Sequence, residues 1–141
     1  MFATFLLLLL TAVSGIKCIA LVQPPVMVVK PGESFSVPCK ITGYSATSTC
    51  TNWIRHKSGQ APEWIGWYCS SSNTGSIDSL KNKIRFSAEA SSNTVILHGQ
   101  NFQSEDTAVY YCAREGMNAF DYWGKGTTVT VTSAVQSAPK S

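Results

Sequence analysis

Short runs of the chain alternate apolar and polar residues with a period of two. The runs 35–41, 94–98 and 128–132 place apolar residues at every second position, which is typical of half-buried strands. From Leu21 onward no stretch keeps a helical period of 3.6 residues over three turns. Turn-forming residues separate the runs at 30–32, 57–59, 73–75 and 90–93. Eight to nine short strands with this spacing predict an all-β sandwich or barrel.

The N-terminus has a different pattern. Residues 5–13 are almost wholly apolar, with small residues at Ser14 and Gly15. The run is shorter than the roughly 20 residues that a membrane-spanning helix needs. It indicates a secretory signal peptide over 1–18, although the positively charged residues that usually begin such a peptide are missing. Cleavage after Gly15, Cys18 or Ala20 is compatible with the pattern, and a buried core strand or helix is the alternative.

Composition narrows the class of protein. The 141 residues allow one ordinary domain, and with 44% hydrophobic and 13% charged residues the chain is not a disordered polyelectrolyte. The net charge is +3, but Lys and Arg are scattered, so we expect no nucleic-acid partner. No second hydrophobic run of spanning length occurs, so we expect no membrane contact by this fragment.

Catalytic and metal-binding patterns are missing from the sequence. The chain has two histidines and no Gly-x-Ser-x-Gly elbow, so we expect no enzyme activity. Five cysteines occur without C-x-x-C spacing, which disfavours a zinc site. We therefore predict no cofactor and no metal. In a secreted chain the cysteines would form disulfides.

A Cys…Trp…Cys pattern runs through the chain. Trp53 follows Cys39 by 14 residues, and Cys112 follows Cys39 by 73 residues, with Tyr110 two residues before it. Together with the segments 53–55, 63–66, 105–114 and 123–131, this pattern resembles the antibody heavy-chain variable domain. The Trp before Gly-x-Gly at 123–126 distinguishes it from light chains and T-cell receptor chains.

The resemblance implies an immunoglobulin V-type Greek-key β-sandwich of about nine strands over 19–133. Residues 134–141 would then begin a constant region. The implied function is antigen recognition by a heavy chain paired with a light chain, in a secreted antibody or a B-cell receptor on the extracellular face of the plasma membrane. A V-type cell-surface receptor or a T-cell receptor chain is the alternative function.

The resemblance also implies how the scaffold is held together. Cys39 and Cys112 would form a disulfide between the two sheets, with Trp53 packed against it. The Tyr110 hydroxyl would bond to nearby backbone, and Asp106 would pair with Arg85.

One inward position departs from the family. Gly99 stands where the family has a large apolar residue, and we expect Phe102 to fill part of the space.

Three loops, at about 43–52, 68–76 and 113–122, would gather at one end of the sandwich and bind antigen. Arg114 and Asp121 would pair across the base of the third loop, and Phe120 would pack there. We expect Glu115 to be exposed and able to contact a basic antigen. The predicted antigen-binding residues are Tyr44, Ser45, Thr47, Ser48, Thr51, Asn52, Trp67, Tyr68, Ser70, Ser71, Asn73, Glu115, Gly116, Met117 and Asn118.

A second cysteine pair is the unusual feature. Cys50 ends the first loop and Cys69 opens the second, on strands that are neighbours in this fold. We predict a Cys50–Cys69 disulfide that reduces the ordering cost of antigen binding. Two free or separately capped thiols are the alternative.

The light-chain face would contain His56, Pro62, Trp64, Tyr111 and Trp123. His56 and Pro62 stand where the family has glutamine and leucine. Because the face stays largely apolar, pairing is favoured over a solitary domain, which would carry charged or polar residues there.

Overall fold

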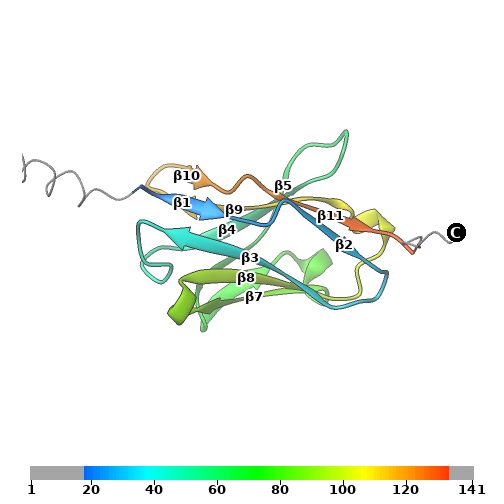
Figure 1. Ribbon diagram of the computed structural model, residues 1–141, viewed down its shortest axis with the longest axis horizontal. Coiled ribbons are helices and arrows are strands. Elements are labelled where there is room, and N and C mark those ends of the chain that lie inside the picture. The colour runs from blue at the N-terminus through cyan, green and yellow to red at the C-terminus, as the bar shows by residue number, and fades with distance from the viewer. Residues whose placement is uncertain (1–17, 134–141) are drawn as a thin grey trace, which may run out of the picture.

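Two β-sheets pack face to face in the computed structural model, which describes residues 18–133 (Figure 1). The four-stranded sheet has the order β1 (Ala20–Val22), β3 (Phe35–Thr42), β8 (Thr94–Gly99), β7 (Ile84–Glu89). The other sheet has the order β2 (Val26–Val29), β11 (Thr127–Val131), β9 (Ala108–Glu115), β4 (Thr51–His56), β5 (Glu63–Ser70), β6 (Asn73–Ser76), and β10 (Phe120–Trp123) also pairs with β9. Three short 3-10 helices connect strands: η1 (Asp78–Leu80), η2 (Ala90–Ser92) and η3 (Ser104–Asp106). The all-β sandwich prediction is confirmed.

The described residues form eleven strands where the sequence pattern predicts about nine. The difference arises because the first and last strands are each divided in two. Pro24 and Pro25, which lack N–H donors, separate β1 from β2, so the N-terminal segment contributes to both sheets. The segment 124–126 separates β10 from β11, and its Gly126 has a φ of +93° that favours glycine.

Two terminal predictions fall outside this description. Of the predicted signal peptide, 1–18, only Cys18 is described, and it is an exposed free cysteine. The predicted constant-region segment, 134–141, lies entirely outside the described residues.

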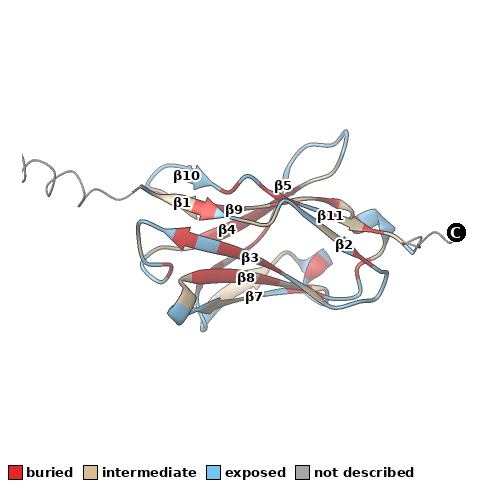
Figure 2. Ribbon diagram, viewed as in Figure 1, coloured by how far each residue is buried: buried red, intermediate tan, exposed pale blue. Residues whose placement is uncertain are grey.

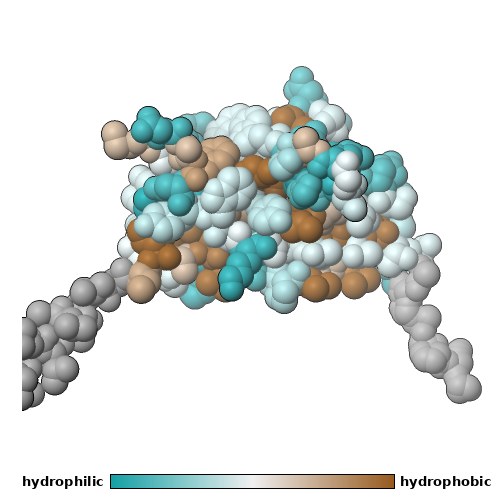
Figure 3. Space-filling model, turned by 90° about the horizontal axis from the view of Figure 1, so that it is seen from above, coloured by the Kyte–Doolittle hydropathy of each residue, from teal (hydrophilic) through white to brown (hydrophobic). Residues whose placement is uncertain are grey.

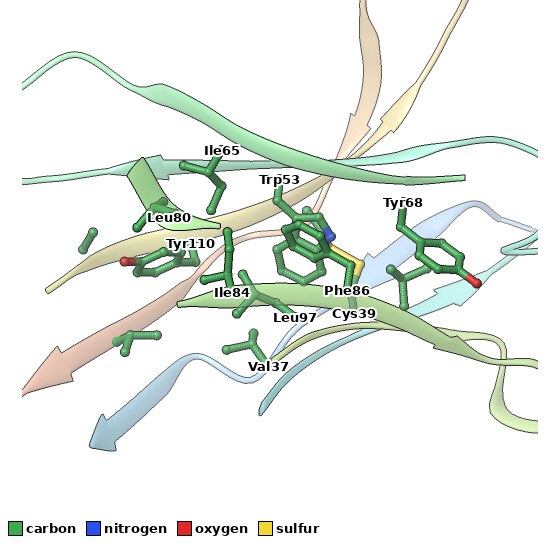
Figure 4. Close-up of a cluster of buried hydrophobic side chains, with 14 of the residues drawn as sticks. Val37, Cys39, Trp53, Ile65, Tyr68, Leu80, Ile84, Phe86, Leu97 and Tyr110 are labelled. Carbon is green, nitrogen blue, oxygen red and sulfur yellow. A yellow bond between two sulfur atoms is a disulfide. The ribbon is translucent and has the colours of Figure 1, made fainter. Parts of the chain in front are cut away.

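The core lies between the sheets, as the red positions of Figure 2 show. In β3 the buried residues Val37, Cys39 and Ile41 alternate with exposed ones, as the period of two predicts. Cys39 and Cys112 form a disulfide across the core, with a Cα–Cα distance of 6.5 Å. Trp53 is fully buried and stacks on Phe86 at 5.6 Å between ring centroids (Figure 4).

Gln23 joins β9 to the segment that leads into β11. Its Nε2 donates to the Tyr110 carbonyl at 2.8 Å, and its Oε1 accepts from the N–H groups of Cys112 and Gly126, both at 3.2 Å. A Cβ built on Gly124 would clash with this amide. Gly124 is therefore required for the close approach of Gln23.

Asp106 forms ion pairs, but the predicted partner, Arg85, is wrong. The Asp106 carboxylate accepts from Lys83 Nζ at 2.7 Å and from Arg55 Nη1 at 3.2 Å. Arg85 is exposed on β7, because residues 84 and 86 are the ones that point into the core. Arg85 pairs in register with His98, whose pKa is lowered by burial and by the Arg85 charge.

The predicted tyrosine hydrogen bond is confirmed. Tyr110 is buried, and its hydroxyl donates to the Asp106 carbonyl at 2.6 Å. The bond fixes the corner between η3 and β9, next to the ion pairs of Asp106.

Two local expectations are also corrected. The space at Gly99 is taken by Phe35, whose ring a Cβ on Gly99 would overlap, and Phe102 packs edge-on against Phe35 at 4.8 Å. The turn predicted at 73–75 lies instead at Ser71 and Ser72, because 73–76 form β6 paired with β5.

Candidate functional site

Three segments far apart in the sequence lie together at one end of the sandwich. Thr51 pairs with Arg114 on β9, and its neighbour Asn52 pairs with Trp67 on β5. The Glu115 N–H donates to the Cys50 carbonyl at 3.0 Å. In Figure 1 the chain leaves β3 and connects β9 to β10 at this end, opposite the end of β11. The predicted loops are therefore neighbours.

The structure contains the Cys50–Cys69 disulfide, with a Cα–Cα distance of 4.1 Å. It links the residue before β4 to the penultimate residue of β5, so it ties the first two loops at their bases. Because Cys50 also accepts the Glu115 N–H, the third loop is anchored at the same point.

Removing this disulfide by the double substitution Cys50→Ser and Cys69→Ser is expected to lower the free energy of unfolding by about 3 kcal/mol in the chain-entropy model. Urea denaturation of the oxidised protein measures the change. The control, Ser71→Ala, alters an exposed neighbour. A double variant as stable as the control, or digestion of the non-reduced protein yielding no peptide that joins Cys50 to Cys69, would contradict the prediction.

Most of the predicted loop residues are exposed on this end. They include polar residues from each loop and Met117, which is 100% exposed at the tip of the third loop. The exposed set is Ser45, Thr47, Ser48, Ser70, Ser71, Asn73, Glu115, Met117 and Asn118.

Three predicted antigen-binding residues are instead buried. Thr51, Asn52 and Tyr68 are 1%, 5% and 7% exposed. Thr51 and Asn52 lie in β4 between β5 and β9, and Tyr68 points into the core (Figure 4). These three residues offer antigen almost no surface. We therefore correct the prediction: they support the loops and do not contact antigen.

The remaining predicted residues lie partly buried beneath the loops. The Tyr44 ring packs against the core, and burial raises the pKa of its hydroxyl to about 12 even though the Arg114 charge acts to lower it. Gly116 follows Glu115 at the start of the third loop and is partly buried. The Trp67 ring stacks on the Trp64 ring, with 5.7 Å between their centroids. These aromatic rings hold the shape of the site.

The base of the third loop is closed as predicted. Arg114 and Asp121 form two hydrogen bonds, of 3.0 and 2.6 Å, across the β9–β10 hairpin. The Arg114 guanidinium also lies 4.9 Å from the ring centres of both Tyr44 and Tyr122. Phe120 packs at the base, edge-on to Trp123.

A hollow of about 350 Å³ lies beside the third loop, lined by Asn52 and residues 115–120. At its edge Asn52 Nδ2 donates to Glu115 Oε1 at 3.0 Å. On its other side Asn52 Oδ1 accepts from Trp64 Nε1 at 2.8 Å. This role of Asn52 could not be predicted from the sequence, because no local pattern reveals a contact between residues 63 positions apart.

The outer face of β4, β5, β9 and β10 presents a cluster of aromatic rings. Trp64 and Trp123 are 42% and 48% exposed, and Tyr111 packs edge-on against Trp123 at 6.0 Å. Figure 3 looks down on the side where β10 and β5 lie, and shows pale and brown side chains side by side. Exposed aromatic rings in one patch are typical of an interaction surface.

His56 and Pro62 lie at the far end of this face. His56 ends β4, opposite Val109, and Pro62 is exposed just before β5. The structure also adds Ile54, which pairs with both Trp64 and Tyr111 and joins them into one row across three strands. The sequence could not predict this role of Ile54, because an apolar residue next to Trp53 in a buried strand resembles an ordinary core residue.

No helix within residues 18–133 is long and apolar enough to cross a bilayer.

Comparisons with known proteins agree with this architecture. The immunoglobulin V-set domain model matches residues 22–132. The chain is 42% identical over 132 residues to the Ig heavy chain V region MOPC 315 of Mus musculus, covering 91% of this chain and 96% of the relative. It is 44% identical over 108 residues to the Ig heavy chain V region XIG14 of Xenopus laevis, covering 74% and 79%. It is 40% identical over 119 residues to the IgW heavy chain V region W26 of Heterodontus francisci, covering 84% and 99%. The chain therefore belongs to the immunoglobulin V-set family, among the antibody heavy-chain variable regions.

Proposed function

We propose that this domain recognises antigen through its three clustered loops while paired with a light-chain variable domain. The observation that carries the proposal is the gathering of the three loops at one end by backbone pairing and the Cys50–Cys69 disulfide. Their exposed residues combine serine, threonine and asparagine with Met117. Such polar residues give adaptable hydrogen bonds, and methionine adapts to irregular surfaces.

The aromatic face of β4, β5, β9 and β10 supports the pairing. Trp64 and Trp123 are exposed, and the partly exposed Tyr111 packs edge-on against Trp123. Aromatic residues are enriched at protein interfaces, where they bury much area at low entropic cost. A cell-surface receptor or T-cell receptor chain is the alternative function, and nothing in the relatives favours it.

The proposal includes a route out of the cell. Residues 1–18 would act as a signal peptide, and 134–141 would begin a constant region. The domain would then lie in a secreted antibody or on the extracellular side of a B-cell receptor. Its role there is binding and not catalysis.

A selection experiment tests antigen recognition. The chain is co-expressed with each of two light-chain variable domains, and each pair selects peptides from a random display library. Selected peptides are expected to lose binding when residues 115–119 are replaced by a Gly-Ser sequence of the same length. The control replaces 57–61, the turn between β4 and β5. Peptides that bind equally to both replacements would contradict the proposal.

Pairing is tested at Trp123. The substitution Trp123→Ser is expected to raise the Kd for a light-chain variable domain at least thirtyfold, which corresponds to about 2 kcal/mol, the scale of an interface hot spot. The control, Val26→Ser, removes an apolar side chain of comparable exposure from β2, which pairs with β11 and not with β10. Sedimentation or surface-binding measurements give the Kd. Equal weakening by both substitutions would argue against this face as the pairing surface.

A further inference from the structure

The three loops carry one uncompensated charge. The segments 43–52 and 68–76 contain no charged residue. In 113–122 the charged residues are Arg114, Glu115 and Asp121, and Arg114 pairs with Asp121. The Glu115 carboxylate therefore gives the three loop segments their net negative charge.

Glu115 is held in place at both its backbone and its side chain. Its N–H donates to the Cys50 carbonyl at 3.0 Å, next to the Cys50–Cys69 disulfide. Its Oε1 accepts from Asn52 Nδ2 at 3.0 Å. Within residues 18–133, Oε2 has no hydrogen-bond partner, so one carboxylate oxygen stays free to accept a donor.

The Asn52 amide can present only its donor side to Glu115. Asn52 is 5% exposed, and its Oδ1 is already occupied by the Trp64 indole N–H at 2.8 Å. Its Nδ2 therefore points to the carboxylate. Because both ends of the amide are bonded, the carboxylate is oriented before any ligand arrives, which lowers the ordering cost of binding.

Glu115 is one of the residues that line the hollow of about 350 Å³ between Asn52 and residues 115–120. Glu115 and Phe120 both line this hollow, and the Phe120 ring packs edge-on against Trp123. A cationic group in this hollow gains charge-assisted hydrogen bonds to the Glu115 carboxylate. No cationic side chain lines the hollow, so nothing from the described residues competes for it.

From this geometry we infer that the hollow is a binding site for a cationic group of the antigen, either a lysine ammonium or an arginine guanidinium. Glu115 supplies the opposite charge, and Asn52 is a positioning residue. The inference rests on the proposed function and adds the chemical class of ligand. An anionic group would be repelled by the Glu115 carboxylate, and a purely aliphatic group would leave that carboxylate without a partner of opposite charge.

The experiment uses peptides selected by the chain paired with each of two light-chain variable domains. The expected result is enrichment of Lys or Arg at one peptide position. Replacing that residue by norleucine is expected to weaken binding to the unchanged chain at least tenfold. Glu115→Gln, which keeps size and removes charge, is expected to weaken the original peptide by a similar factor and the norleucine peptide by less than twofold.

The matched control is Glu105→Gln, an exposed carboxylate in η3 at the opposite end of the domain, which is expected to leave both affinities unchanged. Loop-dependent peptides that bind Glu115→Gln as well as the unchanged chain, or that carry no cation, would overturn the inference while leaving antigen recognition intact. Failure to obtain any loop-dependent peptide would instead overturn both the proposed function and the cation-binding site that rests on it.

Discussion

Replacing both Cys39 and Cys112 with alanine is expected to lower the free energy of unfolding by about 4 kcal/mol. The disulfide closes a segment of 73 residues, and in the chain-entropy model long closures restrict the unfolded chain most. Both cysteines are fully buried beside Trp53, so the substitutions also remove packing from the centre of the core. Urea denaturation followed by tryptophan fluorescence measures the loss.

The control for this prediction is a pair of alanine substitutions at Ser34 and Ser91, both exposed. Surface changes of this kind alter stability by less than about 0.5 kcal/mol. If the cysteine variant unfolded at the same urea concentration as this control, the disulfide would not be a principal fastening of the two sheets.

The substitution Asp106→Asn is expected to cost about 3 kcal/mol at neutral pH, the scale of breaking a buried ion pair. Asp106 is 3% exposed and its carboxylate lies between Arg55 and Lys83. The neutral amide leaves the buried Arg55 charge with Glu63 as its remaining carboxylate partner. Asp78→Asn, an exposed carboxylate in η1, is the control and is expected to change little.

The same substitution has a predicted dependence on pH. Burial acts to raise the pKa of Asp106, but the hydrogen bonds from the Gln103 N–H and from Lys83 outweigh it, so the pKa lies below its ordinary value. A carboxyl with a lowered pKa in the folded state stabilises the protein above its unfolded pKa of about 3.9 and loses that contribution as the pH falls through the folded value.

The stability gap between the unchanged chain and Asp106→Asn should therefore be constant from about pH 5 to 7 and narrow below about pH 4. Urea denaturation at a series of pH values measures the gap. A gap that stays the same down to pH 3, or that widens in acid, would contradict this account of Asp106.

The scaffold could be predicted from sequence because its signals are local or strongly spaced. Alternation in β3 marks Val37, Cys39 and Ile41 as inward, and the Cys39, Trp53 and Cys112 spacing indicates the bridged sandwich. The partner of Asp106 could not be predicted in the same way. Lys83 and Arg85 lie two residues apart, and which one reaches η3 depends on where β7 begins.

The site shows a different limit. Loop boundaries are predicted from the frequency of small polar residues. Thr51 and Asn52 are residues of this kind, but they lie inside β4. Their burial follows from pairing with β5 and β9 on both sides. The hollow beside Glu115 depends on Asn52, 63 residues earlier, and such a contact exists only once the strands are in register.

Hydrogen exchange can show whether the three clustered loops bind antigen. It is measured on the domain paired with a light-chain variable domain, with and without a peptide selected by that pair. We expect the peptide to slow exchange in the loop segments 45–50, 70–73 and 114–119. Slowed exchange confined to the outer face of β3, β8 and β7, with these three segments unchanged, would contradict it.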